Sequence, residues 1–445
     1  MKVTFIEPKN QYKHIYTKFV KHLPLLGPIY LGTILKQRGH EVEILNENMV
    51  DIDPKKIDSD VVCFSTLTST AKRGYQLADQ LRDKAKIIFG GTHASFNTQE
   101  ALQHADQVVV GEAESVIADI VEGKNKNKII QGQRIENLDK LPFPDFSLVR
   151  GLDKSKKRPA TTSRGCPFGC NFCSVTRMFG RKYRFRSPEN IIQEIKNTGR
   201  RSIFFYDDNF AALKSRAKEI LRLMIKKCDY RCWSTQVRTD VAKDEELLKL
   251  MNKSNCSFLY IGLESINPET LKSYNKQQSV KDIKYCIKRL HDYGIGVHGM
   301  FMFGSDMDSK KTIKNTVEFA NHMDIDTVQF SVQTPLPGTP LYESLTQQNR
   351  IFTHNWSLYD SHHVVYQPRN MSAYDLQLHT FEALKDFYSF TNSAKLFLRG
   401  WFETSALHIF GRNLVKKWEK QNENYLKFLA DLKKKYSQKP SLLPA

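Results

Sequence analysis

The sequence predicts an α/β protein with two successive domains of parallel β-sheet, followed by a helical region. Short apolar segments of strand length alternate with segments of helical periodicity along most of the chain, a pattern typical of parallel sheets. The chain has 445 residues, which is too long for one ordinary core. Hydrophobic residues make up 40% of it and aromatic residues 11%, ample for packed interiors.

Residues 1–123 form the first alternating series. We expect strands at KVTFIEP, EVEILNE, DVVCFSTLT, KIIFGGTHA and QVVVGEAE, with helical segments such as LGPIYLGTILKQRGH between them. This order predicts a Rossmann-like, doubly wound sheet, whose ligands bind at the carboxyl ends of the strands. Small and polar residues gather at those ends: Ser65, Thr66 and Thr68, then Gly90, Gly91 and His93, then Gly111 and Glu112.

Residues 124–158 are polar, charged and interrupted by prolines, as expected of a linker. A second alternating series covers residues 159–345, with strands at PATTSRGC, SIFFYDDNF, YRCWSTQVRTD, SFLYIGLES, GVHGMFMFG and TVQFSVQTP. Six β/α units predict a partial (β/α)6 barrel with its chemistry at the carboxyl ends of the strands. Polar residues follow those strands: Asp207, Asp208, Gln236, Arg238 and Glu264.

Residues 346–445 are predicted to form aromatic and basic helices. Their last part combines Phe397, Trp401, Phe402, Phe410 and Trp418 with Arg399, Arg412, Lys416 and Lys417. We expect these aromatic side chains to pack against the barrel. The alternative is peripheral contact with an anionic membrane surface, where a lipid substrate would be met.

The chain is basic, with 67 Lys and Arg against 48 Asp and Glu and a net charge of +19. A positive charge of this size would attract phosphates, nucleic acid or an anionic membrane. It is equally consistent with a basic surface that is only exposed to solvent. Because no apolar run of about 20 residues is present and the chain opens on a strand, we expect a cytoplasmic protein. Eight cysteines in so long a chain indicate reduced thiols and metal binding rather than a disulfide framework.

Three cysteines, Cys166, Cys170 and Cys173, stand in the segment SRGCPFGCNFCSV with the spacing C-x3-C-x2-C. A structural zinc site needs four ligands, so three thiolates make either an incomplete site or an open one. A [4Fe–4S] cluster has four irons, usually bound by thiolates, so three cysteines leave one iron free. The alternatives are a zinc site completed by a distant residue, or three buried thiols. The loop follows the first barrel strand, which places a cluster in the barrel mouth.

With Phe172 before the third cysteine, the motif resembles the C-x3-C-x-aromatic-C signature of the radical S-adenosylmethionine (SAM) superfamily. The resemblance implies that the open iron binds the amino and carboxylate groups of SAM. It implies that an electron from the cluster cleaves SAM to a 5′-deoxyadenosyl radical, which abstracts hydrogen from an unactivated carbon. An external electron donor such as flavodoxin or ferredoxin is implied as well.

The same resemblance implies SAM contacts at the strand ends. Glu264 would bind the ribose, and Gly304 would lie beside the adenine. Asp207 and Asp208 would bind the methionine amino group. Gln236 and Arg238 would bind a carboxylate or hydroxyl group of SAM. The common Gly-Gly-Glu form of the amino-group motif is absent from this chain. For each of these residues, capping or ion pairing at a strand end is the alternative.

Ahead of such a barrel, the segments STLTST, FGGTHA and VVGEAE resemble the cobalamin-binding domain of many radical SAM proteins. A glycine pair permits close approach of a bulky ligand, and nearby hydroxyl groups can bind a buried nucleotide tail, although other nucleotide-binding or empty Rossmann-like domains share both features. The D-x-H-x-x-G loop of other B12 proteins is missing, and His14 and His22 in its place are expected to be loop or surface residues. The resemblance therefore implies base-off cobalamin without a histidine lower ligand.

Together these resemblances imply a cobalamin-dependent radical SAM enzyme that C-methylates a small-molecule or lipid substrate. The segment NWSLYDSHHVVYQPRNMSAYDLQ resembles the one that follows the barrel in hopanoid C-methylases and in relatives of the anaerobic Mg-protoporphyrin ester cyclase. His362 and His363 within it either reach toward the substrate or are incidental. Cyclisation or rearrangement without net methyl transfer is the second hypothesis.

An RNA-modifying enzyme is a third hypothesis, prompted by the basic charge and by the methylthiotransferases, which share the barrel. Those enzymes carry a second three-cysteine cluster in their N-terminal domain, whereas this domain has only Cys63. A non-catalytic cobalamin sensor conflicts with an intact cysteine motif. The sequence therefore favours an enzyme acting on a small molecule or lipid over a nucleic-acid partner.

Overall fold

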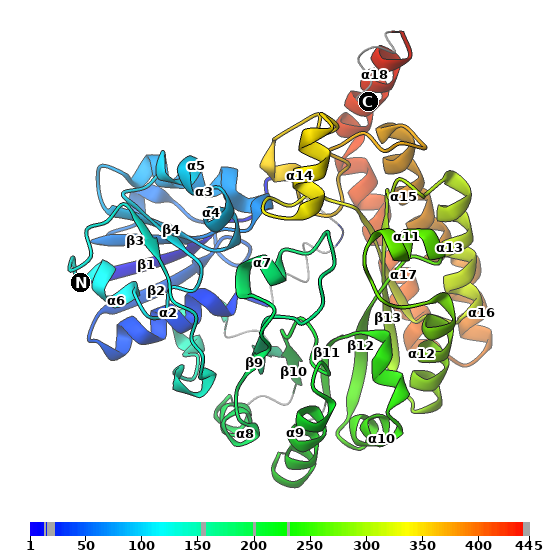
Figure 1. Ribbon diagram of the computed structural model, residues 1–445, viewed down its shortest axis with the longest axis horizontal. Helices are drawn as coiled ribbons and strands as arrows, with labels where there is room; N and C mark the ends of the chain where they lie inside the picture. Colours follow the sequence, from blue (N-terminus) through cyan, green and yellow to red (C-terminus); the bar gives the residue numbers. More distant parts are fainter. Residues whose placement is uncertain (13–14, 16–22, 153–156, 199–201, 229–231, 439–445) are drawn as a thin grey trace.

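The first β-sheet lies beside the second, and the C-terminal helices pack along the far side of the second (Figure 1). This arrangement comes from a computed structural model that describes residues 1–12, 15, 23–152, 157–198, 202–228 and 232–438. His14 and His22, for which the sequence predicts a loop or surface position, lie outside these residues.

The first sheet contains six parallel strands in the order β2-β1-β3-β4-β5-β6. They are β1 (Lys2–Glu7), β2 (Glu41–Asn46), β3 (Val61–Ser65), β4 (Lys86–Gly90), β5 (Gln107–Val110) and β6 (Ile129–Gln131). Alternate side chains face two separate cores, with Phe5 and Cys63 on one side and Ile6 and Phe64 on the other. Because both faces are buried, the inner strands β3, β4 and β5 consist mainly of apolar residues.

Helices cover both faces of this sheet. α2 (Leu26–Gln37) and α6 (Ile117–Val121) pack on one face, and α3 (Ala71–Leu81), α4 (Thr92–Phe96) and α5 (Thr98–Leu102) pack on the other. The strand order reverses at β1, which has β2 on one side and β3 on the other. The predicted doubly wound fold is therefore confirmed, and its ligands are expected outside the carboxyl ends of the strands near this reversal.

Part of the segment predicted as a linker belongs to the first sheet. Its residues 129–131 form β6, which pairs with β5. Leu138, Leu148 and Val149 are buried in the same core as Phe5 and α2. These apolar residues are scattered among charged residues and prolines, so the sequence pattern does not show that they are buried in a core.

The second sheet contains six parallel strands in the order β14-β13-β12-β11-β10-β7. They are β7 (Lys157–Ala160), β10 (Ser202–Phe205), β11 (Cys232–Val237), β12 (Cys256–Glu264), β13 (Gly296–Phe303) and β14 (Thr327–Val332). Strands that follow one another in sequence are neighbours in space, and β7 and β14 remain unpaired at the two edges. This is the predicted partial (β/α)6 barrel.

The barrel helices are α8 (Pro188–Asn197), α9 (Lys214–Lys227), α10 (Glu245–Lys253), α12 (Val280–Asp292) and α13 (Lys310–His322), and they lie along its outer side (Figure 1). Ser187, Ser279 and Ser309 start α8, α12 and α13, because each side-chain oxygen accepts a hydrogen bond from a backbone N–H of the first turn. Three shorter helices lie in the loops: α7 (Val175–Phe179), α11 (Pro268–Ser273) and α14 (Pro340–Gln347).

The C-terminal region consists of α15 (Ala373–Phe387), α16 (Phe390–Leu398), α17 (Phe402–Gln421) and α18 (Glu423–Gln438). α15 and α17 contact β14 and so cover the open edge of the barrel. The expected packing of aromatic residues holds for Trp418, which is buried against Phe381 with ring centroids 4.2 Å apart. The side chains of Phe397, Trp401, Phe402 and Phe410 are exposed instead.

Within the described part of the chain, every helix is too short or too polar to span a bilayer.

Candidate active site

The three cysteines lie on a loop whose ends are joined by two short antiparallel strands, β8 (Ser163–Arg164) and β9 (Arg184–Phe185). Gly165 opens the loop with a φ of 86°. A Cβ atom there would come within 2.6 Å of the carbonyl oxygen of Lys182, so only glycine fits. The loop therefore starts as a tight turn beside the carboxyl end of β7.

The three thiols are half-buried and form no disulfides. Burial raises the pKa of Cys173 to about 12, and the charges of Asp208, Cys170 and Cys166 add to that shift. A closed zinc site needs four protein ligands, whereas a four-iron cluster with one open iron needs three thiolates. Three thiols on one loop therefore fit such a cluster.

Hydrogen bonds from the residues around α11 hold the cysteine loop. Asn275 donates from Nδ2 to the carbonyl oxygen of Gly169 at 3.0 Å, and Asn171 donates from Nδ2 to that of Ser273 at 2.8 Å. Asn275 itself has a φ of 53°, in the left-handed region that asparagine tolerates better than most residues. The loop conformation is thus fixed by the barrel and not by the loop alone.

Two aromatic contacts support the same loop. The guanidinium carbon of Arg238 lies 3.8 Å from the centroid of the Phe168 ring, and Arg238 also donates to the carbonyl oxygen of Lys276. The ring of Phe172 meets that of Tyr274 edge-on, with centroids 5.3 Å apart. Both predicted cofactor residues, Arg238 and Phe172, therefore contact the protein around the cysteines.

Asp207 and Asp208 follow β10 and have different surroundings. Asp207 is fully buried and accepts four hydrogen bonds of 2.6–2.9 Å from the backbone N–H and hydroxyl groups of Thr162 and Ser163. Asp208 lines a cleft between the two domains. The surrounding protein and the charge of Asp207 raise the pKa of Asp208 to about 7. Asp207 thus fixes the start of the cysteine loop, and Asp208 faces the open space.

Glu264 ends β12 with a φ of 60°, which is strained for a residue other than glycine. Its Oε1 pairs with Nζ of Lys276 at 2.6 Å. A Cβ atom on Gly262 would lie 2.6 Å from both of these charged atoms, so that glycine makes room for the ion pair. Strain of this kind, about 1–3 kcal/mol, persists where the surrounding contacts enforce it and is typical of functional sites.

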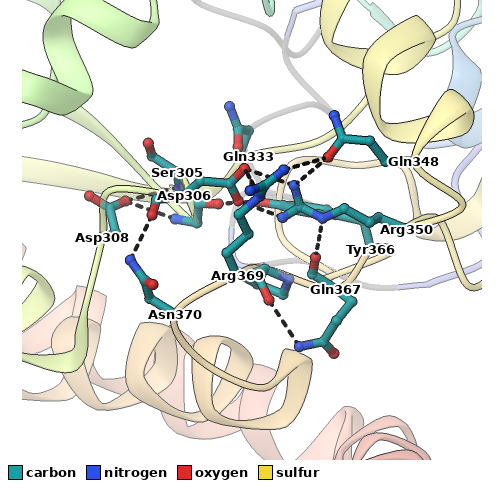
Figure 2. Close-up of polar contacts among 12 residues, drawn as sticks. Ser305, Asp306, Asp308, Gln333, Gln348, Arg350, Tyr366, Gln367, Arg369 and Asn370 are labelled. Carbon is teal, nitrogen blue, oxygen red and sulfur yellow. Dashed lines mark hydrogen bonds and ion pairs between the residues drawn. The ribbon is translucent and has the colours of Figure 1, made fainter. Parts of the chain in front are cut away.

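The loop after β13 is held in place by the segment between α14 and α15 (Figure 2). Arg350 contacts both carboxylate oxygens of Asp306, through Nη1 at 2.7 Å and Nη2 at 2.5 Å. The hydroxyl of Tyr366 donates to the carbonyl oxygen of Gly304, and a Cβ atom on Gly304 would come within 2.5 Å of that hydroxyl oxygen. Gly304, which the sequence predicts beside the adenine, is therefore held by residues far along the chain. These supporting residues were not identified from the sequence.

The cleft between the domains brings together most of the predicted residues of the first sheet. On one side it is lined by the carboxyl ends of β3, β4 and β5, and on the other by Ser163, Arg164 and Asp208. The predicted cofactor residues that line it are Ser65, Thr66, Gly90, Gly91, Gly111, Glu112 and Asp208.

Other predicted residues lie apart from this cleft. His93 is fully buried, with Nε2 3.6 Å from Oε1 of Glu100. His363 is also buried, 2.9 Å from Asp360 through Nδ1 and 2.7 Å from Asn422 through Nε2. The further predicted residues that do not line it are Thr68, Cys166, Cys170, Phe172, Cys173, Asp207, Gln236, Arg238, Glu264, Gly304 and His362.

Several features of the cleft fit a bulky ligand with polar groups. The hydroxyl groups of Thr66 and Tyr30 line the cleft, are buried and have no hydrogen-bond partner among the described residues. A Cβ atom on Gly27 would meet nothing within 4 Å, and one on Gly90 only a carbonyl oxygen at 4.0 Å. Side chains at these glycines would therefore fill space that the sequence keeps open. The residues present thus fit a ligand that brings its own polar groups, as cobalamin would.

A buried ion-pair cluster joins the first sheet to the cysteine loop. Arg164 donates to Glu112 at 2.9 Å and to Glu114 at 2.6 Å. Arg184 donates to Oε2 of Glu112 at 3.0 Å and also pairs with its Oε1. Burial by itself would raise the pKa of Glu112, but the hydrogen bonds from Arg184 and both guanidinium charges hold it below its usual value. Both carboxylate oxygens of Glu112 are thus engaged by the second domain.

Comparisons with known proteins agree with this architecture. Residues 161–320 match the Radical SAM superfamily and residues 13–121 match the B12 binding domain. The bacteriochlorophyllide d C-12(1)-methyltransferase of Chlorobaculum tepidum is 30% identical over 383 residues, which cover 82% of each chain. The hopanoid C-3 methylase of Methylococcus capsulatus is 26% identical, and the match covers 83% of this chain and 77% of the relative. The anaerobic magnesium-protoporphyrin IX monomethyl ester cyclase of Rubrivivax gelatinosus is 25% identical, and the match covers 79% of this chain and 71% of the relative.

Two solved structures share the fold. The cobalamin-dependent S-adenosylmethionine radical enzyme OxsB, with aqua-cobalamin bound, has a TM-score of 0.68 at 15% identity and covers 98% of this chain and 75% of its own. The radical S-adenosylmethionine methyltransferase TsrM from Kitasatospora setae, with cobalamin and a [4Fe-4S] cluster bound, has a TM-score of 0.64 at 16% identity, covering 78% and 75%. Each of these structures therefore has the same fold as this chain over the part that it covers.

Cys166→Ala, Cys170→Ala or Cys173→Ala should each abolish a reconstituted iron–sulfur cluster, because a cluster with three protein ligands has no spare thiolate. Iron and sulfide analysis and the visible absorbance after anaerobic reconstitution would measure this. Cys228→Ala is the matched control, since Cys228 is also a half-buried free thiol but caps the end of α9. A full cluster in any of the three loop variants would contradict the assignment.

Glu112→Ala should lower the free energy of unfolding by about 3 kcal/mol, because it leaves buried arginine charges without their partner. Urea unfolding followed by tryptophan fluorescence would measure the change. Glu136→Ala is the control, since the Glu136–Lys182 pair is exposed to solvent and its loss should change stability little. Equal effects of the two substitutions would show that the buried cluster has no special importance.

Proposed function

The chain belongs to the family of radical SAM enzymes that carry a B12-binding domain, and we propose that it uses SAM and cobalamin to methylate an unactivated carbon of a small-molecule or lipid substrate. When bound, the cluster would supply the electron that cleaves SAM, and cobalamin would carry the methyl group. An external donor such as flavodoxin or ferredoxin would reduce the cluster. The relatives that are methyltransferases and methylases support methyl transfer over other outcomes.

The observation that carries this proposal is the cleft shared by the two domains. Its walls are the carboxyl ends of β3, β4 and β5 and the start of the cysteine loop. We assign the cluster to Cys166, Cys170 and Cys173 on the loop that starts at this wall, so a ligand on the first sheet would lie on the same side of the barrel as the cluster. Methyl transfer to a carbon radical needs this arrangement, because the substrate must lie between the group that generates the radical and the group that donates the methyl.

On the side of the first sheet, we assign cobalamin contacts to the residues that leave space and offer unused polar groups. The hydroxyl of Thr66 would gain a partner in the ligand, and the backbone around Gly91, with a φ of 91°, would approach it closely. Cobalamin would be bound without a histidine lower ligand, since the D-x-H-x-x-G loop is missing from the sequence.

On the barrel side, we assign SAM contacts to residues beside the cysteine loop. Asp208 has its carboxylate in the cleft, where it could accept hydrogen bonds from the methionine amino group. Glu264 would bind the ribose hydroxyls, since Lys276 engages only one of its carboxylate oxygens. Gln236, Arg238 and Gly304 complete this set at the ends of β11 and β13. Asp207 would act indirectly, by fixing Thr162 and Ser163 ahead of the loop.

Methyl transfer predicts two products of SAM. With reductant, cobalamin and a substrate pool of lipid and small-molecule extracts, S-adenosylhomocysteine and 5′-deoxyadenosine should appear together, because one SAM donates a methyl group and another generates the radical. Liquid chromatography with mass spectrometry would measure both. 5′-Deoxyadenosine alone would favour cyclisation or rearrangement, which the cyclase relative makes the second candidate. A Cys173→Ala enzyme is the control for non-enzymatic breakdown of SAM.

Thr66→Val should weaken cobalamin binding by about 10-fold while leaving the apo-protein as stable as before or more so. The hydroxyl has no partner in the described structure, so its removal costs no internal hydrogen bond and relieves an unsatisfied polar group. Cobalamin absorbance retained after anaerobic desalting and thermal unfolding of the apo-protein would measure the two effects. Thr68→Val, at a buried residue that does not line the cleft, is the control.

A further inference from the structure

The hairpin of α16 and α17 exposes an unusual number of large apolar side chains. In α16 and the turn after it, Phe390, Phe397, Leu398 and Trp401 are exposed, and Leu398 retains 85% of its full accessibility. Phe402, at the start of α17, is 59% exposed. With Ile409, which is also exposed, these residues form what we call the hairpin face. Soluble proteins rarely leave so many large apolar groups together in water unless the surface binds something.

The outward side of α17 changes character along its length. Phe402, Ala406 and Ile409 follow one another at helical spacing on the exposed side, and Lys416 and Lys420 continue the same stripe, with Lys417 next to it. Ser405, His408, Val415 and Trp418 lie on the buried side. The apolar end of the helix therefore leads directly into a row of lysines.

The charge of the hairpin is strongly unequal. Residues 390–421 contain six Lys and Arg but only two Asp and Glu. One of the two acids, Glu419, pairs with Lys385 at 2.5 Å, and the other is Glu403. No carboxylate of the described residues lies within ion-pair distance of Lys416, Lys417 or Lys420. Their positive charge is thus available to an external anionic surface.

The hairpin face lies at the opposite end of the barrel from the cysteine loop. Gly400, Trp401 and Phe402 line a depression together with Gly296 and Asp326, which stand at the amino ends of β13 and β14. Arg399 anchors the turn there through a 2.7 Å ion pair with Asp324. The cysteine loop and the cleft are at the carboxyl ends of the strands. Binding at the hairpin face would therefore leave the cleft open to solvent.

We propose that the hairpin face is a docking surface for a bilayer that contains anionic lipids. Phe397, Leu398 and Phe402 enter the boundary between headgroups and acyl chains, as the apolar side of an interfacial helix does. Lys416, Lys417 and Lys420 contact the anionic headgroups, with their aliphatic stems along the apolar surface. Because apolar area and charge act together, binding requires both, and salt weakens it by screening the lysines.

Flotation of the full-length protein with lipid vesicles tests this proposal. The protein should float with phosphatidylcholine vesicles that contain about one third phosphatidylglycerol and not with pure phosphatidylcholine, and the bound fraction should fall between about 0.05 M and about 0.5 M NaCl. Lys416→Gln, Lys417→Gln and Lys420→Gln combined should lower the partition coefficient about 100-fold. Phe397→Ser, Leu398→Ser and Phe402→Ser combined should lower it at least as much.

A matched control is available on α9. Ile225→Ser with Lys226→Gln and Lys227→Gln removes an exposed apolar group and two exposed lysines from another helix, and it should leave vesicle binding unchanged. All variants should release 5′-deoxyadenosine from SAM at the wild-type rate, since the hairpin is remote from the cysteines. This separates failure of docking from failure of the proposed chemistry.

Three results would overturn the proposal: no flotation of the wild type with anionic vesicles, no loss of flotation in the lysine variant, or equal loss in the α9 control. Light scattering adds a fourth. A wild-type dimer that the serine variant converts to a monomer would assign the face to a second copy of the chain. If the serine variant does not fold, as judged by its circular dichroism, the lysine variant decides alone, because its substitutions are on fully solvated side chains.

Discussion

The buried ion pairs between Glu112, Glu114, Arg164 and Arg184 connect two domains that otherwise have separate cores. Charges are costly to remove from water, and this cost is recovered only when each is paired with good geometry. The carboxylates follow β5 of the first sheet, while the arginines stand in β8 and β9 at the base of the cysteine loop. These ion pairs therefore tie the base of that loop to the edge of the first sheet beside the cleft.

The rest of the site depends on this placement. Asp207 fixes the two residues ahead of the loop, and the residues around α11 support its tip. The C-terminal region closes the open edge of the barrel and clamps the loop after β13 through Arg350 and Tyr366. The segment between α14 and α15 thus contributes to the site at one end of the barrel, while the hairpin face of α16 and α17 lies at the other.

The fold was largely predictable because its signals are local. β1, β3 and β10 bury both of their faces, so they contain apolar runs that stand out from the amphipathic helices between them. The segment from residue 124 to 158 was harder to interpret. Ile130, Leu138 and Val149 are separated by charges and prolines, and only the presence of the first sheet beside them gives these residues a core.

The sequence by itself predicted the iron–sulfur chemistry, since Cys166, Cys170, Cys173 and the glycines around them are contiguous in the chain and their spacing is visible without the fold. Tertiary structure decided which polar residues face the cleft. Asp207 and Asp208 are neighbours in sequence, yet one is enclosed by Thr162 and Ser163 and the other lines the cleft. A buried polar group takes whichever partner the fold brings within hydrogen-bond distance, and residues such as Tyr366 and Gly304, far apart along the chain, meet only after folding.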